Sequence, residues 1–282
     1  MSAMHTRSIE PRPLRLHLDG TTPRHWLAGD GVSTQLFNAL SLVFPRGEQM
    51  FVDAVRANKD AVRDPELKQA VRDFIGQEVN HGRAHVEFNE WLASLGLPVA
   101  EIDREVAARI AQRRRLSPKQ LLAITCALEH FTAILAAAML AHPDLIADMH
   151  EDVRPLWLWH AIEEIEHKSV AFDVYAESGA SYERRVITMA LVTVMFLTRV
   201  TLRHRRLMRA DLLLGDRTAR KRAMRRFFGP RGVLASALPS YLAYYGRRFH
   251  PDDIDDEAGL TWGRAQLDAL IAHGKSTLRS AA

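Results

Sequence analysis

The chain has 282 residues, of which 47% are hydrophobic, enough to bury the core of one large domain or two. Its 38 lysines and arginines exceed its 34 aspartates and glutamates by only 4, and this weak, dispersed excess argues against nucleic-acid binding. A single cysteine, Cys126, excludes an intrachain disulfide and a cysteine-based zinc or iron–sulfur site. The N-terminus lacks the apolar core of a secretory signal, so we expect a cytoplasmic protein.

Helical patterns run through the chain, and no alternating strand pattern bounded by hairpin turns interrupts them. We therefore predict an all-α protein. Capping residues, prolines and glycines give the expected helix boundaries. The expected segments, in chain order, are an extended arm over 1–30, a helical region over 31–58 that Pro45 and Gly47 kink, and long helices over 64–95, 117–141 and 156–179.

The connection between the expected helices over 64–95 and 117–141 is unusually long. It reads GLPVAEIDREVAARIAQRRRLS, about 20 residues where 2 to 8 are usual, and predicts a crossover with a short helix of its own. Four long helices with such a crossover are typical of a ferritin-like bundle. We expect this core over 31–180 and a C-terminal helical extension over 181–282 packed on it, all in a single domain.

The stretch VITMALVTVMFLT at 186–198 is apolar, but its 13 residues are fewer than the roughly 20 that cross a bilayer. We expect a buried helix here. The arginine-rich flanks leave open a membrane-surface contact through 186–210, which would place the protein at the periphery of the inner membrane. The basic runs at 203–206 and 220–226 are expected to be solvated helix faces.

Two of the expected helices carry the pattern Glu-x-x-His. Glu78 is paired with His81, and Glu164 with His167. Each pair lies on the apolar face of its helix, where a buried carboxylate needs a positively charged partner. Glu166 points away from that face and is expected to be solvated. Both pairs are therefore candidate metal ligands.

A lone glutamate precedes each pair on another helix: Glu48 lies 30 residues before the first, and Glu129 lies 35 residues before the second. This spacing predicts two half-sites from an internally repeated helix pair. Four carboxylates can neutralise two metal ions, and histidines complete the coordination. Oxygen and imidazole ligands without thiolate favour two iron ions, with manganese or zinc as alternatives. The competing interpretations are a solvated Glu48 and hydrogen-bonded core histidines.

Three further residues extend the predicted site. His160 precedes Glu164 by one helical turn on the same face, so we predict a third histidine ligand, with a hydrogen-bond donor to a ligand as the alternative. His85, one turn after His81, is more ambiguous: it could support a ligand by hydrogen bonding, lie in the core or bind metal, and we include it as a candidate supporting residue. Glu163 lies at the edge of the ligand face and is the candidate catalytic base for a hydrolytic reaction.

Four segments carry a resemblance to known proteins: LFNALSLVFPRGEQMF, FIGQEVNHGRAH, LAITCALEHFTAILA and LWLWHAIEEIEHKSVAFDVY. Over roughly residues 20–260 the chain resembles the bacterial family labelled "predicted metal-dependent hydrolase". Its ligand order is also similar to that of ferritin-like di-iron N-oxygenases, which oxidise aryl amines. Carried over residue by residue, the resemblance implies as metal ligands Glu48, Glu78, His81, Glu129, His160, Glu164 and His167.

The function we expect is that of a di-iron oxidoreductase. It would activate O2, with an unidentified electron donor, to oxygenate or oxidise a small or lipophilic organic substrate. The alternative is a metal-dependent hydrolase in which a dinuclear metal pair activates water. A non-catalytic iron-handling or structural bundle is a third interpretation. We expect a homodimer as one possible assembly, and a monomer or dimer would count against iron storage, which requires a cage.

Overall fold

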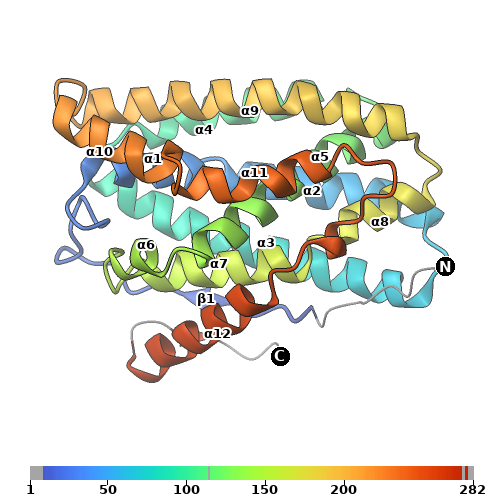
Figure 1. The fold of residues 1–282 in the computed structure, drawn as a ribbon, viewed down its shortest axis with the longest axis horizontal. Helices are drawn as coiled ribbons and strands as arrows, with labels where there is room; N and C mark the ends of the chain where they lie inside the picture. The colour runs from blue at the N-terminus through green and yellow to red at the C-terminus, as the bar shows by residue number, and fades with distance from the viewer. Residues whose placement is uncertain (1–8, 114, 275–276, 279–282) are drawn as a thin grey trace.

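The computed structural model describes residues 9–113, 115–274 and 277–278, and nearly all of its regular structure is helical (Figure 1). Two short strands, β1 (Leu14–Arg15) and β2 (Thr277–Leu278), pair antiparallel. The helices are α1 (Gly31–Ser41), α2 (Phe44–Asn58), α3 (Pro65–Ser94), α4 (Val99–Arg113), α5 (Pro118–Leu140), α6 (Pro143–Ala147), α7 (Arg154–Glu166), α8 (Val170–Glu177), α9 (Tyr182–Ala210), α10 (Arg217–Phe228), α11 (Val233–Ala243) and α12 (Glu257–Ala272), with 3-10 turns at Lys59–Ala61 and Pro251–Asp253. The predicted all-α class is confirmed.

The sequence signals for helix ends hold in three places. The side chain of Asp64 accepts a hydrogen bond from the backbone N–H of Glu66 at the start of α3. Ser117 accepts in the same way from Gln120 at the start of α5. The expected break in the first helical region separates α1 from α2, and Pro45 lies in the first turn of α2, where its missing N–H costs nothing.

The predicted helix over 156–179 is not continuous. It divides into α7 and α8 at His167, whose φ of −103° and ψ of 8° leave the helical region. The following Lys168 is buried, and its Nζ donates to the backbone oxygen of Ile254 and to Asp256 at 2.6 Å. These tertiary contacts stabilise the break, which no glycine or proline marks.

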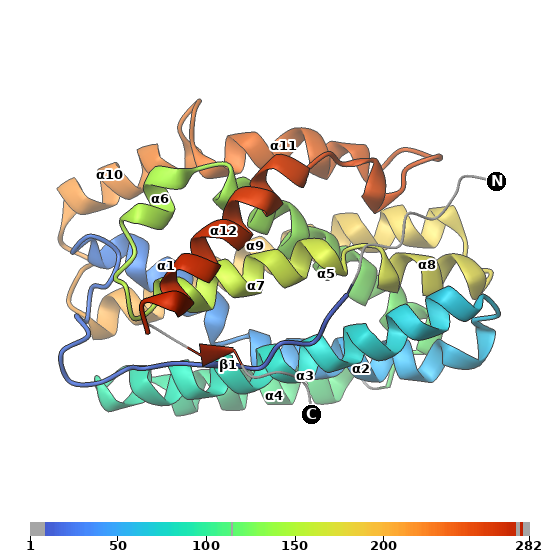
Figure 2. The same cartoon turned by 90° about the horizontal axis from the view of Figure 1, so that it is seen from below.

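Helices α2, α3 and α5, together with the consecutive helices α7 and α8, surround the centre of the molecule. α2 packs against α3 and α5, α5 packs against α7, and α8 contacts both α3 and α5. α4 forms the predicted crossover between α3 and α5, along the outside of the bundle (Figures 1 and 2). The C-terminal helices α9, α11 and α12 cover α5 and α7. Polar side chains from α2, α3, α5 and α7 therefore project into one shared interior.

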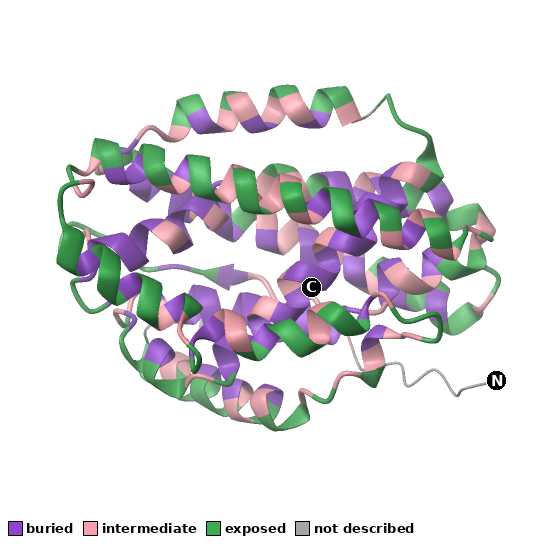
Figure 3. Ribbon diagram, turned by 45° about the horizontal axis from the view of Figure 1, so that its top comes forward, coloured by how far each residue is buried: buried purple, intermediate pink, exposed green. Residues whose placement is uncertain are grey.

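The apolar helix after residue 180 lies on the surface, contrary to the expectation that it is buried. α5 and α9 are both long and apolar enough to span a membrane, but 78% of the apolar window of α5 is buried against only 22% of that of α9. Figure 3 shows exposed residues along α9. The reason is that α9 packs on α1 and α5 with one face only, so that its other apolar residues remain uncovered.

The N-terminal arm lies along α3 as an extended segment (Figure 2). The backbone oxygen of Glu10 accepts a hydrogen bond from Nε2 of Gln77 at 3.2 Å. Pro11 lies over Gly76, where an added Cβ would come within 2.7 Å of the proline Cγ. These contacts direct Arg12 towards α7, and the arm therefore supplies a cation near the predicted site.

Candidate metal centre

The structure brings all seven predicted ligands into one buried cluster between the helices. Each of the seven residues is at most 5% exposed, so water does not solvate their side chains. They come from α2 (Glu48), α3 (Glu78 and His81), α5 (Glu129), α7 (His160 and Glu164) and the break after α7 (His167). The solvated interpretation of Glu48 is excluded by its 1% exposure.

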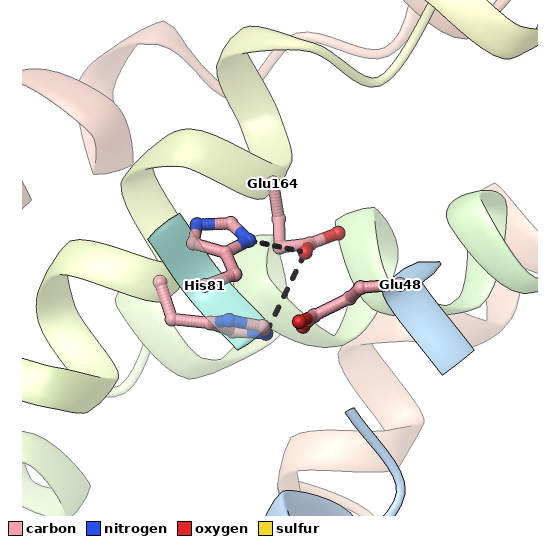
Figure 4. A group of neighbouring side chains, drawn as sticks. Glu48, His81 and Glu164 are labelled. Atoms are coloured by element: carbon pink, nitrogen blue, oxygen red, sulfur yellow. Dashed lines mark ion pairs between the residues drawn. The ribbon is translucent and has the colours of Figure 1, made fainter. Parts of the chain in front are cut away.

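One group of donors comprises Glu48, His81, His160 and Glu164, each with a ligand atom within 4.8 Å of the others. Oε1 of Glu164 lies 3.5 Å from Nδ1 of His81 and 3.6 Å from Nε2 of His160. Figure 4 shows Glu48, His81 and Glu164 converging from three different helices. Two imidazoles and two carboxylates at this spacing can hold a divalent ion. We call this set the histidine-rich group.

A second group comprises Glu78, Glu164 and His167. Nε2 of His167 lies 3.1 Å from Oε1 of Glu78, 3.6 Å from Oε2 of Glu164 and 3.4 Å from Oε2 of Glu129. We call Glu78, Glu129, Glu164 and His167 the carboxylate-rich group. Glu164 belongs to both groups and directs one oxygen to each, as a bridging carboxylate would.

The polar atoms of this cluster lack other partners. Both carboxylate oxygens of Glu48, Glu78 and Glu129 are buried without a hydrogen bond, as is Nε2 of His167. Buried polar atoms without partners are strongly unfavourable. The donors are hard oxygens and imidazole nitrogens, which suit first-row divalent metals. The residues present therefore fit a metal site.

Burial sets the charge of the carboxylates when no cation is bound. Burial raises the pKa of Glu48, the charge of His81 lowers it and the charge of Glu164 raises it. The resulting pKa is about 8. Burial and the neighbouring carboxylates hold the pKa values of Glu78 and Glu129 well above their usual range. These glutamates retain protons near neutral pH unless a metal ion replaces them, so metal binding releases protons.

The shared carboxylate and the histidine opposite it behave differently. Burial raises the pKa of Glu164, but His160, His167 and His81 outweigh it and hold the value well below its usual range. Burial lowers the pKa of His160 to about 3, which keeps the imidazole in the neutral form that metals bind. Glu164 is thus ionised and His160 neutral at neutral pH.

Glu163 lies behind His81. Its Oε2 is 3.2 Å from Nε2 of His81, and its Oε1 accepts from Nε of Arg12 at 3.4 Å. Burial lowers the pKa of His81, but Glu163 and Glu164 raise it to about 10. With Nε2 directed to Glu163, Nδ1 of His81 faces the other donors. This geometry favours orientation of His81 over the predicted role of Glu163 as a base.

A glutamine that the sequence interpretation did not single out orients His167. Nδ1 of His167 donates to Oε1 of Gln77 at 2.9 Å, which leaves Nε2 unprotonated for a metal. Nε2 of Gln77 in turn donates to Glu166 at 2.9 Å. Glu166 is buried and paired with Arg12 at 2.5 Å and Arg264 at 2.8 Å, so the expectation that water solvates it is wrong.

His85 lies behind His160, as expected for a supporting residue. Nε2 of His85 is 3.3 Å from Nδ1 of His160, and Nδ1 of His85 is 2.8 Å from Oγ of Ser41. Ser41 donates to Oδ1 of Asn89 at 2.8 Å. Burial and the other histidines hold the pKa of His85 well below its usual range. This chain fixes the ring of His160 with Nε2 towards Glu164.

A cavity of about 320 Å³ adjoins the histidine-rich group. It lies between α2, α4, α5 and α9 and is lined mainly by apolar side chains. Among the described residues that line it, Glu48 is the only predicted ligand. A substrate in this cavity would meet the metal site at Glu48.

The fold is helical, and two adjoining groups of glutamate and histidine donors are buried in it. These features place the protein in the class of helical metal-binding proteins. The model of the family described as "Predicted metal-dependent hydrolase" matches residues 10–255, and the chain belongs to this family. No curated protein and no solved structure matches the chain. The family description indicates an enzyme that uses a metal for hydrolysis, in agreement with the buried donors.

Proposed function

We propose that the protein is a metal-dependent hydrolase with a dinuclear centre held in a ferritin-like four-helix bundle. The observation that carries this proposal is the position of Glu164, whose two oxygens face two separate donor groups. A single ion would leave one group of buried donors unsatisfied. Two ions would satisfy both groups, with one shared carboxylate between them.

Each residue has a distinct part in this proposal. Glu48, His81 and His160 would hold one ion, Glu78, Glu129 and His167 the other, and Glu164 both. A metal pair bound there supplies Lewis acidity and lowers the pKa of a water molecule. Apolar side chains of the cavity exclude bulk water from the substrate's reacting group.

The role that we propose for Glu163 differs from the catalytic base that the sequence predicts. Glu163 is engaged with His81 and Arg12 and does not line the cavity. Glu48 carries the only carboxylate among the described lining residues. We therefore assign Glu163 to the orientation of His81, and Glu48 to the side of the centre that faces the substrate.

Oxidation by O2 at two iron ions is the second candidate. The specific observation in its favour is the donor set, in which four carboxylates and three histidines without thiolate suit iron. The apolar cavity at Glu48 would suit a lipophilic substrate for this reaction as well. Only this second candidate requires that the metal is iron and that an external electron donor is present.

Metal analysis with two activity assays separates the candidates. We expect about two metal ions per chain and turnover of small aryl esters or amides. The variant Glu164→Ala should lose both properties, whereas Glu90→Ala, at an exposed position on α3, should retain them. An iron-loaded protein that hydrolyses none of these substrates but consumes O2 after chemical reduction would replace hydrolysis by oxidation. A protein that binds no metal would overturn both.

A further inference from the structure

The cavity beside Glu48 has a cationic wall. Arg109 and Arg113 on α4 and Arg199 and Arg203 on α9 all line it. Glu105 is the carboxylate that compensates them, at 3.3 Å from Arg109 and 3.7 Å from Arg199. Several guanidinium groups therefore share one carboxylate on this wall.

Two of these arginines are poorly compensated. Arg203 is 7% exposed, and its Nε has no hydrogen-bond partner among the described residues. The guanidinium of Arg113 contacts the sulfur atoms of Met50 and Met195, which are weak acceptors. Burial lowers the pKa of Arg203 to about 10, so the group is still charged at neutral pH. A buried cation whose nearest carboxylate is shared with other arginines is unfavourable.

Most of the other residues that line the cavity are apolar. Its walls include Leu40, Phe44, Phe51, Ile110, Leu128 and Phe196. The volume of about 320 Å³ lies at the lower end of the range for small-molecule sites. A ligand that satisfies both walls carries an apolar body and a negative charge.

We propose that the substrate is an amphiphile with an anionic head group, a carboxylate or a phosphate, bound by Arg113 and Arg203. Guanidinium groups bind both kinds of head group through paired hydrogen bonds. The apolar body would lie against α2 and α5, and the reacting bond would lie at Glu48. The position of the reacting bond rests on the proposed function, but binding of the head group does not require a metal.

Calorimetric titration of the purified full-length chain, with its metal content measured, tests this class. We expect dodecanoate or dodecyl phosphate to bind at least about tenfold more tightly than dodecanol or dodecyltrimethylammonium, because a charged hydrogen bond is lost with the latter two. A preference between the two anions distinguishes a carboxylate from a phosphate head group. If dodecanol or dodecyltrimethylammonium bound as tightly as the two anionic probes, the inference would be overturned.

Variants of the arginines locate the head group. Arg203→Gln and Arg113→Gln should each weaken dodecanoate binding about tenfold, whereas Arg205→Gln, at an exposed position of α9, should not. The thermal midpoint of Arg203→Gln should not fall, because the substitution removes a poorly compensated buried charge. If this variant does not fold, Arg113→Gln decides the matter. Unchanged affinity in Arg113→Gln would exclude the assigned head-group site.

Failure of this inference and of the proposed function have different signatures. Anion-selective binding by a chain that holds no metal would support the substrate class and count against the metal centre. A chain that holds two metal ions but shows no preference for anions would support the metal centre and count against the substrate class. The two measurements on one sample therefore separate the two claims.

A second inference rests on the outer surface of α9. Ile187, Leu191, Val194 and Leu202 are each more than half exposed and lie on one face of the helix over about four turns. Arg205 and Arg209 continue that face and are exposed too. An apolar stripe that ends in arginines matches a bilayer surface with anionic head groups.

We infer that this face of α9 lies on an anionic membrane surface. The chain should co-sediment with vesicles that contain phosphatidylglycerol more than with phosphatidylcholine vesicles. Leu191→Glu should abolish sedimentation, whereas Val86→Glu, at an exposed position on α3, should not. Equal sedimentation with both vesicles, or a chain dimer in solution that Leu191→Glu dissociates, would overturn the inference in favour of a protein partner.

Discussion

The two donor groups of the centre differ in composition and in access. The histidine-rich group has His81 and His160 beside its carboxylates, and it reaches the cavity through Glu48. The carboxylate-rich group has His167 as its single histidine, and none of its residues lines the cavity. Both groups share Glu164. The centre is therefore asymmetric although the sequence pattern repeats.

Because of this asymmetry, we expect one group mainly to retain an ion and the other mainly to activate a bound molecule. In the carboxylate-rich group, buried Glu78 and Glu129 do not line the cavity and would supply negative charge to an ion that displaces their protons, which would suit retention of that ion. In the histidine-rich group, imidazole ligands, which are neutral when they bind a metal, would leave more positive charge on an ion next to the cavity, and this would suit activation of a bound molecule. Changes in the two groups should therefore have separable effects on metal content and on turnover.

The largest effect is expected from the shared residue. Glu164→Ala removes a donor from both groups, so bound metal should fall to about a tenth or less of the wild-type content. Elemental analysis of the purified variant provides the measurement. Loss of only one ion would show that Glu164 does not bridge the groups.

A single-group substitution should have about half that effect. Glu129→Ala removes a donor from the carboxylate-rich group only, and we expect loss of about half of the bound metal. His160→Ala, in the histidine-rich group, should instead retain more metal but lose more turnover than Glu129→Ala. Unchanged metal content in Glu129→Ala would refute its assignment as a ligand.

The residues that orient the histidines should have smaller effects. Glu163→Gln weakens the contact with His81, and metal affinity should fall about 10–100-fold without a change in the number of sites. Gln77→Leu should do the same through His167. Competition with a chelator of known affinity measures both. If Glu163→Gln retained full affinity and lost only turnover, Glu163 would be the base that its sequence position suggests.

The smallest expected effect concerns pH. In metal-free protein the pKa of Glu48 is raised from 4.5 to about 8, so folded protein holds its proton more tightly than unfolded protein. Its contribution to stability is complete below about pH 4.5 and is lost as the pH rises to about 8, with a slope of up to about one proton. Thermal midpoints of metal-free wild type should fall over this window.

The metal-loaded protein and Glu48→Gln provide the controls for pH. Both should lack the Glu48 contribution to this decline, because a metal ion or an amide takes the place of the titrating proton. An identical decline in Glu48→Gln would assign the effect to other groups.

The sequence predicts much of this arrangement because local rules suffice for it. Proline, glycine and capping side chains fix the ends of α3 and α5, and helical periodicity places Glu78 with His81 and Glu164 with His167 on inward faces. These rules depend on neighbours within a few residues. The donor cluster then follows from packing four such faces together.

The features that the sequence does not predict depend on distant partners. The break at His167 is stabilised by contacts of Lys168 with a segment 88 residues away. Glu166 is buried because Arg12 and Arg264 reach it from the two ends of the described chain. The exposure of α9 likewise depends on which helices cover it. No local pattern contains these pairings.

The contact between Pro11 and Gly76 has an evolutionary consequence. Any side chain at position 76 would collide with the proline ring, since even a Cβ would lie 2.7 Å from it. The two positions should therefore vary together among relatives: a chain with a larger residue at 76 should lack proline at 11 or hold its arm differently. Relatives that keep glycine at 76 together with proline at 11 are therefore the ones in which we expect the arm still to place an arginine beside the centre.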